Sequence, residues 1–418
     1  MSTTSAPAAD LTDRVVVTGL GPVSSIGTGA EEFLSGLRAG RDGSRPVTSF
    51  DTRGYEHSYA CEIVDFKPRE WIGGLETDTL GRATQFAVAA AHLALRDAGL
   101  EARALRKDRV LISIGTTDGE SRDLDGLAEV DVNQGPQHMD PVVAGRIPAG
   151  RLSSMIAREL GLTDVEAITL PTACAAGNYA IGYGYDVVRS GEADFALCGG
   201  ADALCRKTFT GFYRLGTIAP RCCSPFDVDR QGILTGEGAG VLVMESLESA
   251  LRRGARIYGE VLGYGLNCDA HHPVAPDEDS IAECIDLALK DAGVTTEEVD
   301  FISAHGTGTK ANDVTEARAI RQVYGDHMPR TISMKSMIGH TMGAASALAA
   351  IGCALSISEG FIPPTINHRS TDPECDLDCV PNQALETEVS VVQNNGLAFG
   401  GNNSVVIFSR CDTAAVMS

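Results

Sequence analysis

Short runs of β-branched residues alternate along the chain with alanine-rich stretches. In the first half this order is seen in residues 14–18, 87–98 and 110–113. Runs of the first kind are typical of strands, and alanine-rich stretches are typical of helices. The alternation therefore predicts an α/β fold with mainly parallel sheets.

The same order of elements returns in the second half of the chain. Residues 257–261, 281–292 and 300–304 repeat the strand, the helix and the second strand. Each half then has a helix of small residues and a closing strand, at 176–190 and 240–244 in the first half and at 343–359 and 403–408 in the second. Any α/β chain repeats to some extent. The simplest account is an internal duplication of about 150–200 residues, with halves at 14–252 and 253–412.

Length and charge narrow the class of protein. The 418 residues suffice for two domains or one large duplicated one. With 34 Lys and Arg against 56 Asp and Glu, the net charge of -22 argues against a general binder of nucleic acid or anionic membranes. Residues 1–14 do not resemble a secretory signal, and no uninterrupted apolar run would span a bilayer. We expect a cytoplasmic protein whose first dozen residues are disordered.

Cysteine spacing and an N-terminal glycine pattern exclude two kinds of cofactor site. The twelve cysteines are scattered, and neither Cys222-Cys223 nor the pair Cys375 and Cys379 has the matching second pair of a zinc site. Most should be reduced and buried. The segment VVVTGLG, residues 15–21, starts like a dinucleotide-binding motif, but Ser24 stands where the third glycine would be. Its glycines are expected to form a tight strand-to-loop turn.

Cys174 lies where a β-branched strand runs into a helix rich in glycine and alanine, in ITLPTACAAG (residues 168–177). Backbone N–H groups and the helix dipole stabilise negative charge at such a junction. The position predicts thiolate character and a nucleophilic role. A buried cysteine that only packs between helix and sheet is the alternative, and the local sequence does not decide between the two.

Two histidines occupy comparable junctions. His305 ends a predicted strand and opens HGTGT, and His340 precedes a helix of small residues. In the proposed duplication, the regions of Cys174 and His340 occupy equivalent places, each leading into the last helix of its half, and related positions in two packed halves can face one cleft. Single histidines are often hydrogen-bonded interior residues. Finding both at such junctions, with Lys335 and Glu316 as possible orienting charges, favours a catalytic role.

The number of histidines distinguishes between two kinds of cysteine chemistry. A cysteine hydrolase uses one histidine as a general base together with an orienting amide or carboxylate. A second histidine indicates that two imidazole donors hold a carbonyl oxygen while negative charge develops on it. Such an arrangement suits decarboxylation to an enolate.

Nearly the whole chain resembles the elongating β-ketoacyl-[acyl carrier protein] synthases of dissociated fatty-acid and polyketide systems. The matching motifs, in order, are at residues 15–27 (VVVTGLGPVSSIG), 172–177 (TACAAG), 224–245 (SPFDVDRQGILTGEGAGVLVME), 305–317 (HGTGTKANDVTEA), 335–345 (KSMIGHTMGAA), 363–367 (PPTIN) and 398–408 (AFGGNNSVVIF). The resemblance implies a duplicated thiolase-like fold, layered αβαβα, with two mainly parallel mixed sheets. It also implies a dimer.

The resemblance assigns the central chemistry to three side chains. It implies that Cys174 takes an acyl group from the phosphopantetheine thioester of an acyl carrier protein. His305 and His340 would bind the malonyl thioester carbonyl and stabilise the enolate left by decarboxylation, which attacks the acyl group. The backbone N–H groups of Cys174 and Phe399 would form the oxyanion hole.

Further roles follow from the same resemblance. Lys335 and Glu316 match the pair that sets the charge around the second histidine. Thr307 and Thr309 match the hydroxyls that hold the pantetheine arm, and Phe399 matches an aromatic gate. The resemblance implies no redox cofactor and no catalytic metal.

The chain departs from the family pattern at several positions. Ala398 and Asn402 replace the glycine and threonine common around the gate, and Lys310 replaces the proline usual after HGTGT. Residues 76–79 (ETDT) stand where many relatives carry Lys and Arg for carrier docking, and the stretch 116–129 is also altered. These departures favour a polyketide synthase over a housekeeping fatty-acid enzyme.

Two other functions and the docking of the partner remain open at this stage. A non-catalytic, chain-length-setting subunit shares the fold but characteristically lacks the cysteine, and a thiolase fits two histidines in these motifs less well. The dimer can be a homodimer or a heterodimer with such a subunit. Carrier proteins are typically acidic, so docking needs a local basic patch, for which Arg206, Lys207 and Arg221 are candidates, or a patch on a second subunit.

Overall fold

The computed structural model describes residues 11–412, so most of the expected disordered lead-in lies outside the described residues. The first half contains β1 (Val15–Ser24), β2 (Gly27–Thr28), α1 (Ala30–Arg38), β3 (Arg45–Pro46), β4 (Tyr59–Ala60), α2 (Arg82–Asp97), β5 (Val110–Gly115), α3 (Ser121–Gln134), α4 (Pro141–Ala144), α5 (Arg151–Leu160), β6 (Val165–Leu170), α6 (Ala176–Arg189), β7 (Phe195–Asp202), α7 (Arg206–Arg214), β8 (Gly238–Ser246) and α8 (Leu247–Arg253). The second contains β9 (Gly259–Cys268), α9 (Glu278–Ala292), β10 (Phe301–Ser303), α10 (Lys310–Tyr324), β11 (Arg330–Ile332), α11 (Lys335–Ile338), α12 (Ala345–Glu359), β12 (Phe361–Ile362), β13 (Leu385–Glu386), β14 (Val391–Leu397) and β15 (Asn402–Ser409). The predicted strands and helices are all present.

The strands of the two halves are arranged in the same way. The first half has the order β6-β5-β7-β8-β1, and the second has the order β11-β10-β14-β15-β9. In each half the three outer strands pair in parallel, and the fourth, β8 or β15, runs antiparallel to both neighbours. Four of the five strands in each half therefore share one direction, as the α/β alternation predicted. The exact boundary between the halves, after residue 252, stays a prediction.

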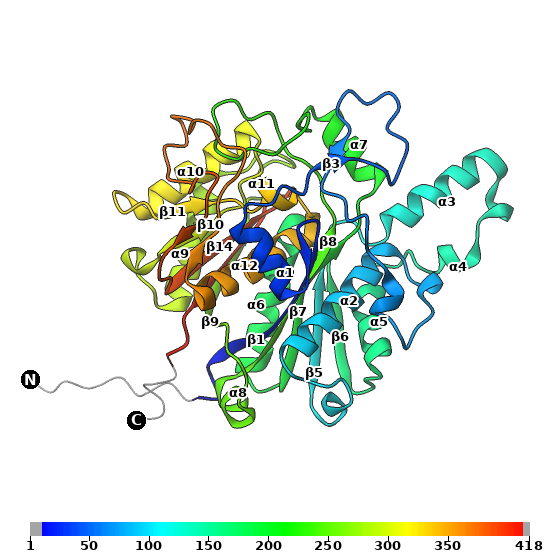
Figure 1. Cartoon of the computed structure of the whole chain (residues 1–418), viewed down its shortest axis with the longest axis horizontal. Helices are drawn as coiled ribbons and strands as arrows, with labels where there is room; N and C mark the ends of the chain where they lie inside the picture. The colour runs from blue at the N-terminus through cyan, green and yellow to red at the C-terminus, as the bar shows by residue number, and fades with distance from the viewer. Residues whose placement is uncertain (1–10, 413–418) are drawn as a thin grey trace, which may run out of the picture.

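The two sheets meet edge to edge and form one hydrogen-bonded ladder of 11 strands. The joint is an antiparallel pairing of β1 with β9, in which Val15 lies opposite Val261 and Val17 lies opposite Gly259. The two mixed sheets expected from the resemblance are thus continuous with each other. Both halves of this ladder curve around the same central helices (Figure 1).

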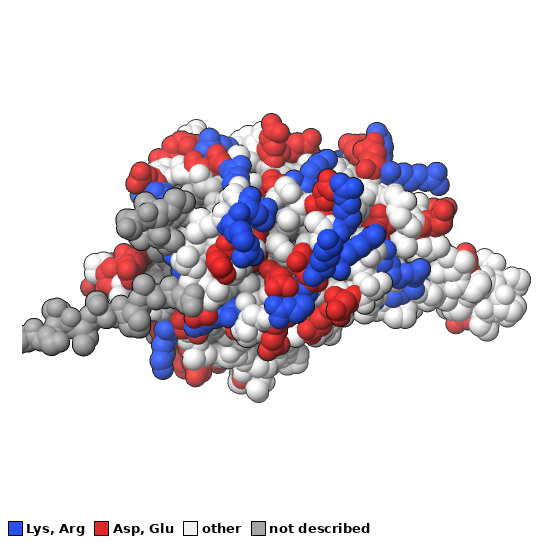
Figure 2. Space-filling model, turned by 90° about the horizontal axis from the view of Figure 1, so that it is seen from below, with Lys and Arg blue, Asp and Glu red and all other residues white. Residues whose placement is uncertain are grey.

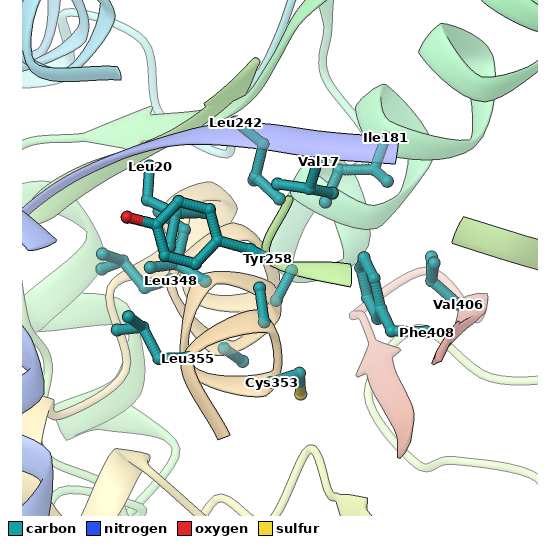
Figure 3. Close-up of a cluster of buried hydrophobic side chains, with 14 of the residues drawn as sticks. Val17, Leu20, Ile181, Leu242, Tyr258, Leu348, Cys353, Leu355, Val406 and Phe408 are labelled. Carbon is teal, nitrogen blue, oxygen red and sulfur yellow. The ribbon is translucent and has the colours of Figure 1, made fainter. Parts of the chain in front are cut away.

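The middle layer consists of α6 and α12, each of which contacts strands of both halves. The two helices touch at Gly177, where an added Cβ would lie 2.6 Å from the backbone nitrogen of Ala347. Apolar side chains from β1, α6, β8, α12 and β15 fill the space around α12 (Figure 3). Outside the ladder, α2 and α5 cover the first half, and α9 and α10 cover the second. These are the five layers of the expected fold.

The glycines of VVVTGLG serve a different purpose from the one expected. Gly19 and Gly21 lie inside β1, which continues to Ser24, and not in a turn. A Cβ at either position would overlap a backbone carbonyl of α2. The glycines therefore allow the helix to lie directly on the strand.

The segment Met342–Glu359, which includes α12, corrects one sequence expectation. By length and mean hydropathy it could cross a membrane, although the sequence analysis found no such run. In the structure 89% of this segment is buried inside the protein. It therefore forms part of the core.

One helical segment extends away from the body. Helices α3 and α4 project to the right in Figure 1. Only Ser121 and Leu127 of α3 are buried, and Val132 at its far end is 83% exposed. The face of the projecting end that Figure 2 shows has few charged groups, whereas the body beside it carries both signs. The segment as a whole also carries the exposed acids Glu129, Asp131 and Asp140. The nearby strand β6 forms the edge of the ladder, and a free edge and an exposed apolar segment are both features of a protein interface.

Candidate active site

Cys174 lies in a tight turn between β6 and α6. The turn is a 3₁₀ segment, Ala173–Ala175, and Ala173 has a φ of 50°. A positive φ is uncommon for a residue other than glycine, so the backbone bends sharply here. Cys174 is 5% exposed and lines a cavity, and the backbone N–H of Phe399 donates a hydrogen bond to its sulfur. The predicted strand-to-helix junction is confirmed.

The protonation state of Cys174 differs from the expectation. Burial raises the pKa of the thiol to about 12, although the positive charge of Lys335 and the N–H of Phe399 act in the opposite direction. The predicted thiolate is wrong for the resting site, because the cost of burying the charge outweighs the stabilisation that the start of α6 provides. The thiol is protonated at neutral pH.

His305 follows β10, and two charged side chains fix its backbone. The carboxylate of Glu316 accepts hydrogen bonds from the N–H groups of His305 and Gly306, at 2.7 and 2.8 Å. The ammonium group of Lys335 donates to the carbonyl oxygen of His305 at 2.6 Å and lies 3.4 Å from its Nδ1. Both partners therefore bind His305, the first histidine. The resemblance had assigned this pair to the second histidine, His340, and the contacts correct that expectation. Only the charge of Lys335 also acts on His340.

His340 lies beside His305 and has a defined tautomer. The Nδ1 of His340 accepts a hydrogen bond from the N–H of Met342 at 3.2 Å, which leaves the ring proton on Nε2. The centres of the two imidazole rings are 5.3 Å apart, with the planes at 82°. Burial and the charge of Lys335 hold the pKa of both histidines well below the usual range. Both rings are therefore neutral at pH 7.

The two threonines of HGTGT line the same cavity as Cys174 and the two histidines. The hydroxyl oxygens of Thr307 and Thr309 are 2.9 Å apart. Thr309 also caps α10, because its hydroxyl accepts a hydrogen bond from the N–H of Asn312. The family departure at Lys310 is the first, exposed residue of this helix. Proline is tolerated at that position too, so the substitution leaves the start of the helix intact.

Phe399 lies at the junction of two cavities. Its ring is 39% exposed and lies 5.4 Å from the ring of Phe212, which is 6.4 Å from the ring of His340. One cavity contains the two threonines, and a second cavity lies beside α7. Both cavities are lined by Cys174, Phe212 and Phe399. The following residues, Gly400 and Gly401, have φ values of 85° and 81°, which favour glycine.

Phe212 is a residue that the sequence analysis missed. It belongs to α7, whose apolar residues have the spacing of a helix packed on one face. Nothing in that pattern separates a residue that lines a cavity from one that packs in the core.

The docking candidates are in different environments. Arg206 is exposed, with Tyr55 as a hydrogen-bond partner. Lys207 is paired with the carboxylate of Asp118 at 2.6 Å and donates to the hydroxyl of Ser121. Arg221 is exposed and lies over the ring of Tyr59. Lys207 is therefore occupied within the protein, and Arg206 and Arg221 are more accessible to a partner.

The described residues contain no group of three or more His, Cys, Asp or Glu side chains placed to hold a metal ion. The twelve cysteines all lie within the described part of the chain, and none forms a disulfide. Nine of them are buried, which agrees with their expected role as small apolar residues.

Comparison with protein families decides the identity of this site. Residues 12–250 match the family described as "Beta-ketoacyl synthase, N-terminal domain", and residues 258–369 match the family described as "Beta-ketoacyl synthase, C-terminal domain". The chain belongs to the β-ketoacyl synthase family. It is an acyltransferase of the β-ketoacyl-[acyl carrier protein] synthase type, as the sequence motifs predicted.

Two curated proteins are similar to this synthase over nearly their whole lengths. It is 39% identical over 408 residues to 3-oxoacyl-[acyl-carrier-protein] synthase 2 of Synechocystis sp., covering 95% of this chain and 98% of the relative. The identity to nodulation protein E of Rhizobium sp. is 37% over 411 residues, covering 95% and 99%.

Solved structures with this fold include two assemblies of synthases. A chain of the ishigamide ketosynthase/chain length factor is 63% identical, with a TM-score of 0.94 over 95% of this chain and 99% of that one. A chain of a type II polyketide ketosynthase, bound to its acyl-carrier protein and a hexaketide, is 31% identical, with a TM-score of 0.87 over 96% and 99%.

Proposed function

We propose that this synthase catalyses the decarboxylative condensation of a malonyl group with an acyl group held on Cys174, within a type II polyketide pathway. The observation that carries the proposal is the shared cavity of one buried thiol and two neutral histidines. A neutral imidazole can donate a hydrogen bond to an oxygen that becomes negative without transferring its proton to that oxygen.

The first half-reaction loads the enzyme. The sulfur of Cys174 attacks the thioester carbonyl of an acyl carrier protein, a new C–S bond forms, and the bond to the pantetheine sulfur breaks. The proton of the Cys174 thiol ends on the departing pantetheine thiol. The charge of Lys335 and the N–H of Phe399 lower the cost of the thiolate that forms during the attack.

The second half-reaction makes the carbon–carbon bond. A malonyl group on the carrier's phosphopantetheine loses carbon dioxide, and the electron pair of the broken bond forms an enolate whose oxygen accepts hydrogen bonds from His305 and His340. The enolate carbon attacks the acyl carbonyl, and the bond to the sulfur of Cys174 breaks. One proton from solvent restores the thiol. Thr307 and Thr309 hold the pantetheine arm in the cavity that they line.

The pathway and the partner subunit are the finer part of the proposal. Identity of 63% to the ishigamide ketosynthase/chain length factor, against 39% to the fatty-acid relative, supports a polyketide pathway and a heterodimer with a chain-length-setting subunit. The free edge of β6 and the exposed end of α3 are surfaces that such a subunit would cover. We place the enzyme in the cytoplasm, with an acyl carrier protein as its substrate-bearing partner and with no cofactor of its own.

Two alternatives predict different results in one experiment. The purified protein, alone and with its partner subunit, is incubated with an acyl-carrier protein and analysed by intact mass, and the release of carbon dioxide from malonyl-carrier is measured in parallel. A ketosynthase gains one acyl mass on Cys174 and releases carbon dioxide. A non-catalytic subunit does neither, and a thiolase is acylated by an acyl-coenzyme A without consuming malonyl groups.

A further inference from the structure

Asp202 is a buried carboxylate that the mechanism above does not use. It is the last residue of β7 and is 0% exposed. Its four hydrogen-bond partners all donate: the Thr116 hydroxyl at 2.6 Å and the Asp118 N–H at 3.0 Å to Oδ1, and the N–H groups of Thr117 and Gly343 at 2.8 and 2.6 Å to Oδ2. Three of these donors belong to the loop after β5, but Gly343 belongs to the second half of the chain.

The bond to Gly343 connects Asp202 to His340. Gly343 follows Met342, whose N–H donates to the Nδ1 of His340. Met342 has a φ of 51°, so the backbone of this turn is in a conformation that a residue other than glycine rarely adopts. Such a conformation persists only where its surroundings hold it. The carboxylate of Asp202 supplies that restraint on the residue next to Met342.

Close packing leaves the turn little room on the same side. A Cβ added to Gly343 would lie 2.5 Å from the Cα of Thr116 and 2.7 Å from the backbone nitrogen of Thr117. The turn is thus pressed against the loop after β5, and Asp202 binds both the turn and the loop. Asp202 therefore restrains the residue that directly follows Met342, and the N–H of Met342 is the donor to the Nδ1 of His340.

We propose that Asp202 is a positioning residue for His340, which keeps the Nε2 proton of that histidine directed into the cavity. The inference rests on the proposed function, because the enolate oxygen is the group that this proton would meet. A carboxylate suits the position because all four partners donate. Two of the donors bind Oδ1 and the other two bind Oδ2. An asparagine would place its NH₂ group against one of these pairs and leave that pair without its acceptor.

The test separates the two half-reactions in Asp202→Asn. We expect the release of carbon dioxide from malonyl-carrier to fall about tenfold or more through kcat, because a small displacement of a catalytic group is costly. Acylation of Cys174 should not fall, since that step does not use His340 and the charge of Asp202 acts to raise the pKa of the Cys174 thiol. Equal losses in the two half-reactions, or no loss in either, would overturn the proposal.

A matched variant removes a buried carboxylate away from the turn. Asp227 is also buried and accepts hydrogen bonds from three backbone N–H groups, those of Asp229, Arg369 and Ser370, but it does not bind the turn at Gly343 and lines neither cavity. Asp227→Asn should therefore leave the ratio of decarboxylation to acylation unchanged. A change in this ratio as large as that of Asp202→Asn would mean that any lost buried charge has the same effect, which would also overturn the proposal.

A second measurement does not depend on activity. In protein with ¹⁵N-labelled histidine, His340 should show an unprotonated Nδ1 and a protonated Nε2, assigned with His340→Gln. Asp202→Asn should shift both ring resonances, and unchanged resonances would contradict the inference even if the wild type proved inactive. If Asp202→Asn does not fold, Asp202→Glu is compared instead, and a greater loss of decarboxylation than of acylation is again expected.

Discussion

The turn that holds Cys174 and the turn that follows His340 have nearly the same backbone but different neighbours. Both begin at a threonine, Thr172 with φ −97° and ψ 36°, and Thr341 with φ −85° and ψ 30°. Both continue through a residue with positive φ, 50° at Ala173 and 51° at Met342, into a 3₁₀ turn and then a helix of the middle layer. Gly343 therefore takes the place in the second turn that Cys174 takes in the first.

The strand beside each turn accounts for the difference. Asp202 ends β7 and binds the N–H of Gly343, whereas Phe399 follows the corresponding strand β14 and gives its N–H to the sulfur of Cys174. At the turn after His340, the carboxylate of Asp202 thus accepts a hydrogen bond from a backbone N–H. At the turn that holds Cys174, the neighbouring group is the backbone N–H of Phe399, and the thiol faces a cavity. Two copies of one backbone can therefore serve different purposes, one carrying the nucleophile and the other fixing a histidine.

Removing the nucleophile should have the largest effect. Cys174→Ala should abolish the formation of the acyl-enzyme, because no other group forms the thioester, while malonyl decarboxylation is at least partly retained. Intact mass after incubation with acyl-carrier checks the first expectation. Cys268→Ala, at an exposed cysteine, should load normally. An acyl mass on the Cys174→Ala protein would refute the assignment.

Loss of either histidine should come next. His305→Ala and His340→Ala should each slow decarboxylation by about 100-fold or more, which is the scale of losing one donor to a developing oxyanion. Acylation of Cys174 should be less affected. Release of carbon dioxide is the measurement, and His327→Ala, at an exposed histidine, is the control. Wild-type rates in both active-site variants would mean that the two rings do not hold the enolate.

The third prediction concerns the stability of the turn that follows His340. Gly343→Ala should lower the free energy of unfolding by about 1–3 kcal/mol, because its Cβ would press on the backbone of Thr116. Gly211→Ala, in a helix where the added Cβ meets nothing within 4 Å, should instead raise it by roughly 0.5–1 kcal/mol. Urea unfolding of the two variants checks the difference. Equal stabilities would show that the turn can yield.

The smallest expected effect is on selectivity. Phe399→Ala should change which acyl chains are accepted as well as the rate, because its ring separates the two cavities and the two glycines after it permit backbone rotation. The measurement is the product profile obtained with carrier proteins that bear acyl groups of different chain length. Val228→Ala, which is also exposed but lines neither cavity, is the matched control. An unchanged profile at an unchanged rate would count against a gate.

Sequence patterns were sufficient for the elements and for the residues that meet in the cavity. The repeat of strands and small-residue helices predicted the two halves, and the junctions at Cys174, His305 and His340 predicted that these side chains converge. Such predictions succeed because strand ends in a parallel arrangement meet at one edge of the sheet.

Features that depend on contacts between distant segments could not be predicted. The protonated state of Cys174 follows from complete burial, and the binding of Lys335 to His305 follows from the packing of α11 against the loop after β10. Phe212 and Asp202 carry no local signal, because a phenylalanine in an amphipathic helix and an acid at a strand end usually have only structural roles. The projection of α3 was likewise absent from the pattern.

The buried helix α12 has a consequence for how the protein is made. The strands of the first half that it covers are complete once β8 ends at Ser246, but α12 begins only at Ala345. At a synthesis rate of about 5–20 residues per second, the ribosome needs about 5–20 s to add the intervening segment. During that interval α6 covers part of the inner surface of the first half, but the part of β1, β7 and β8 that packs against α12 is uncovered. The segment that later covers it is apolar enough for a membrane. Newly made chains should therefore depend on chaperones until α12 is in place.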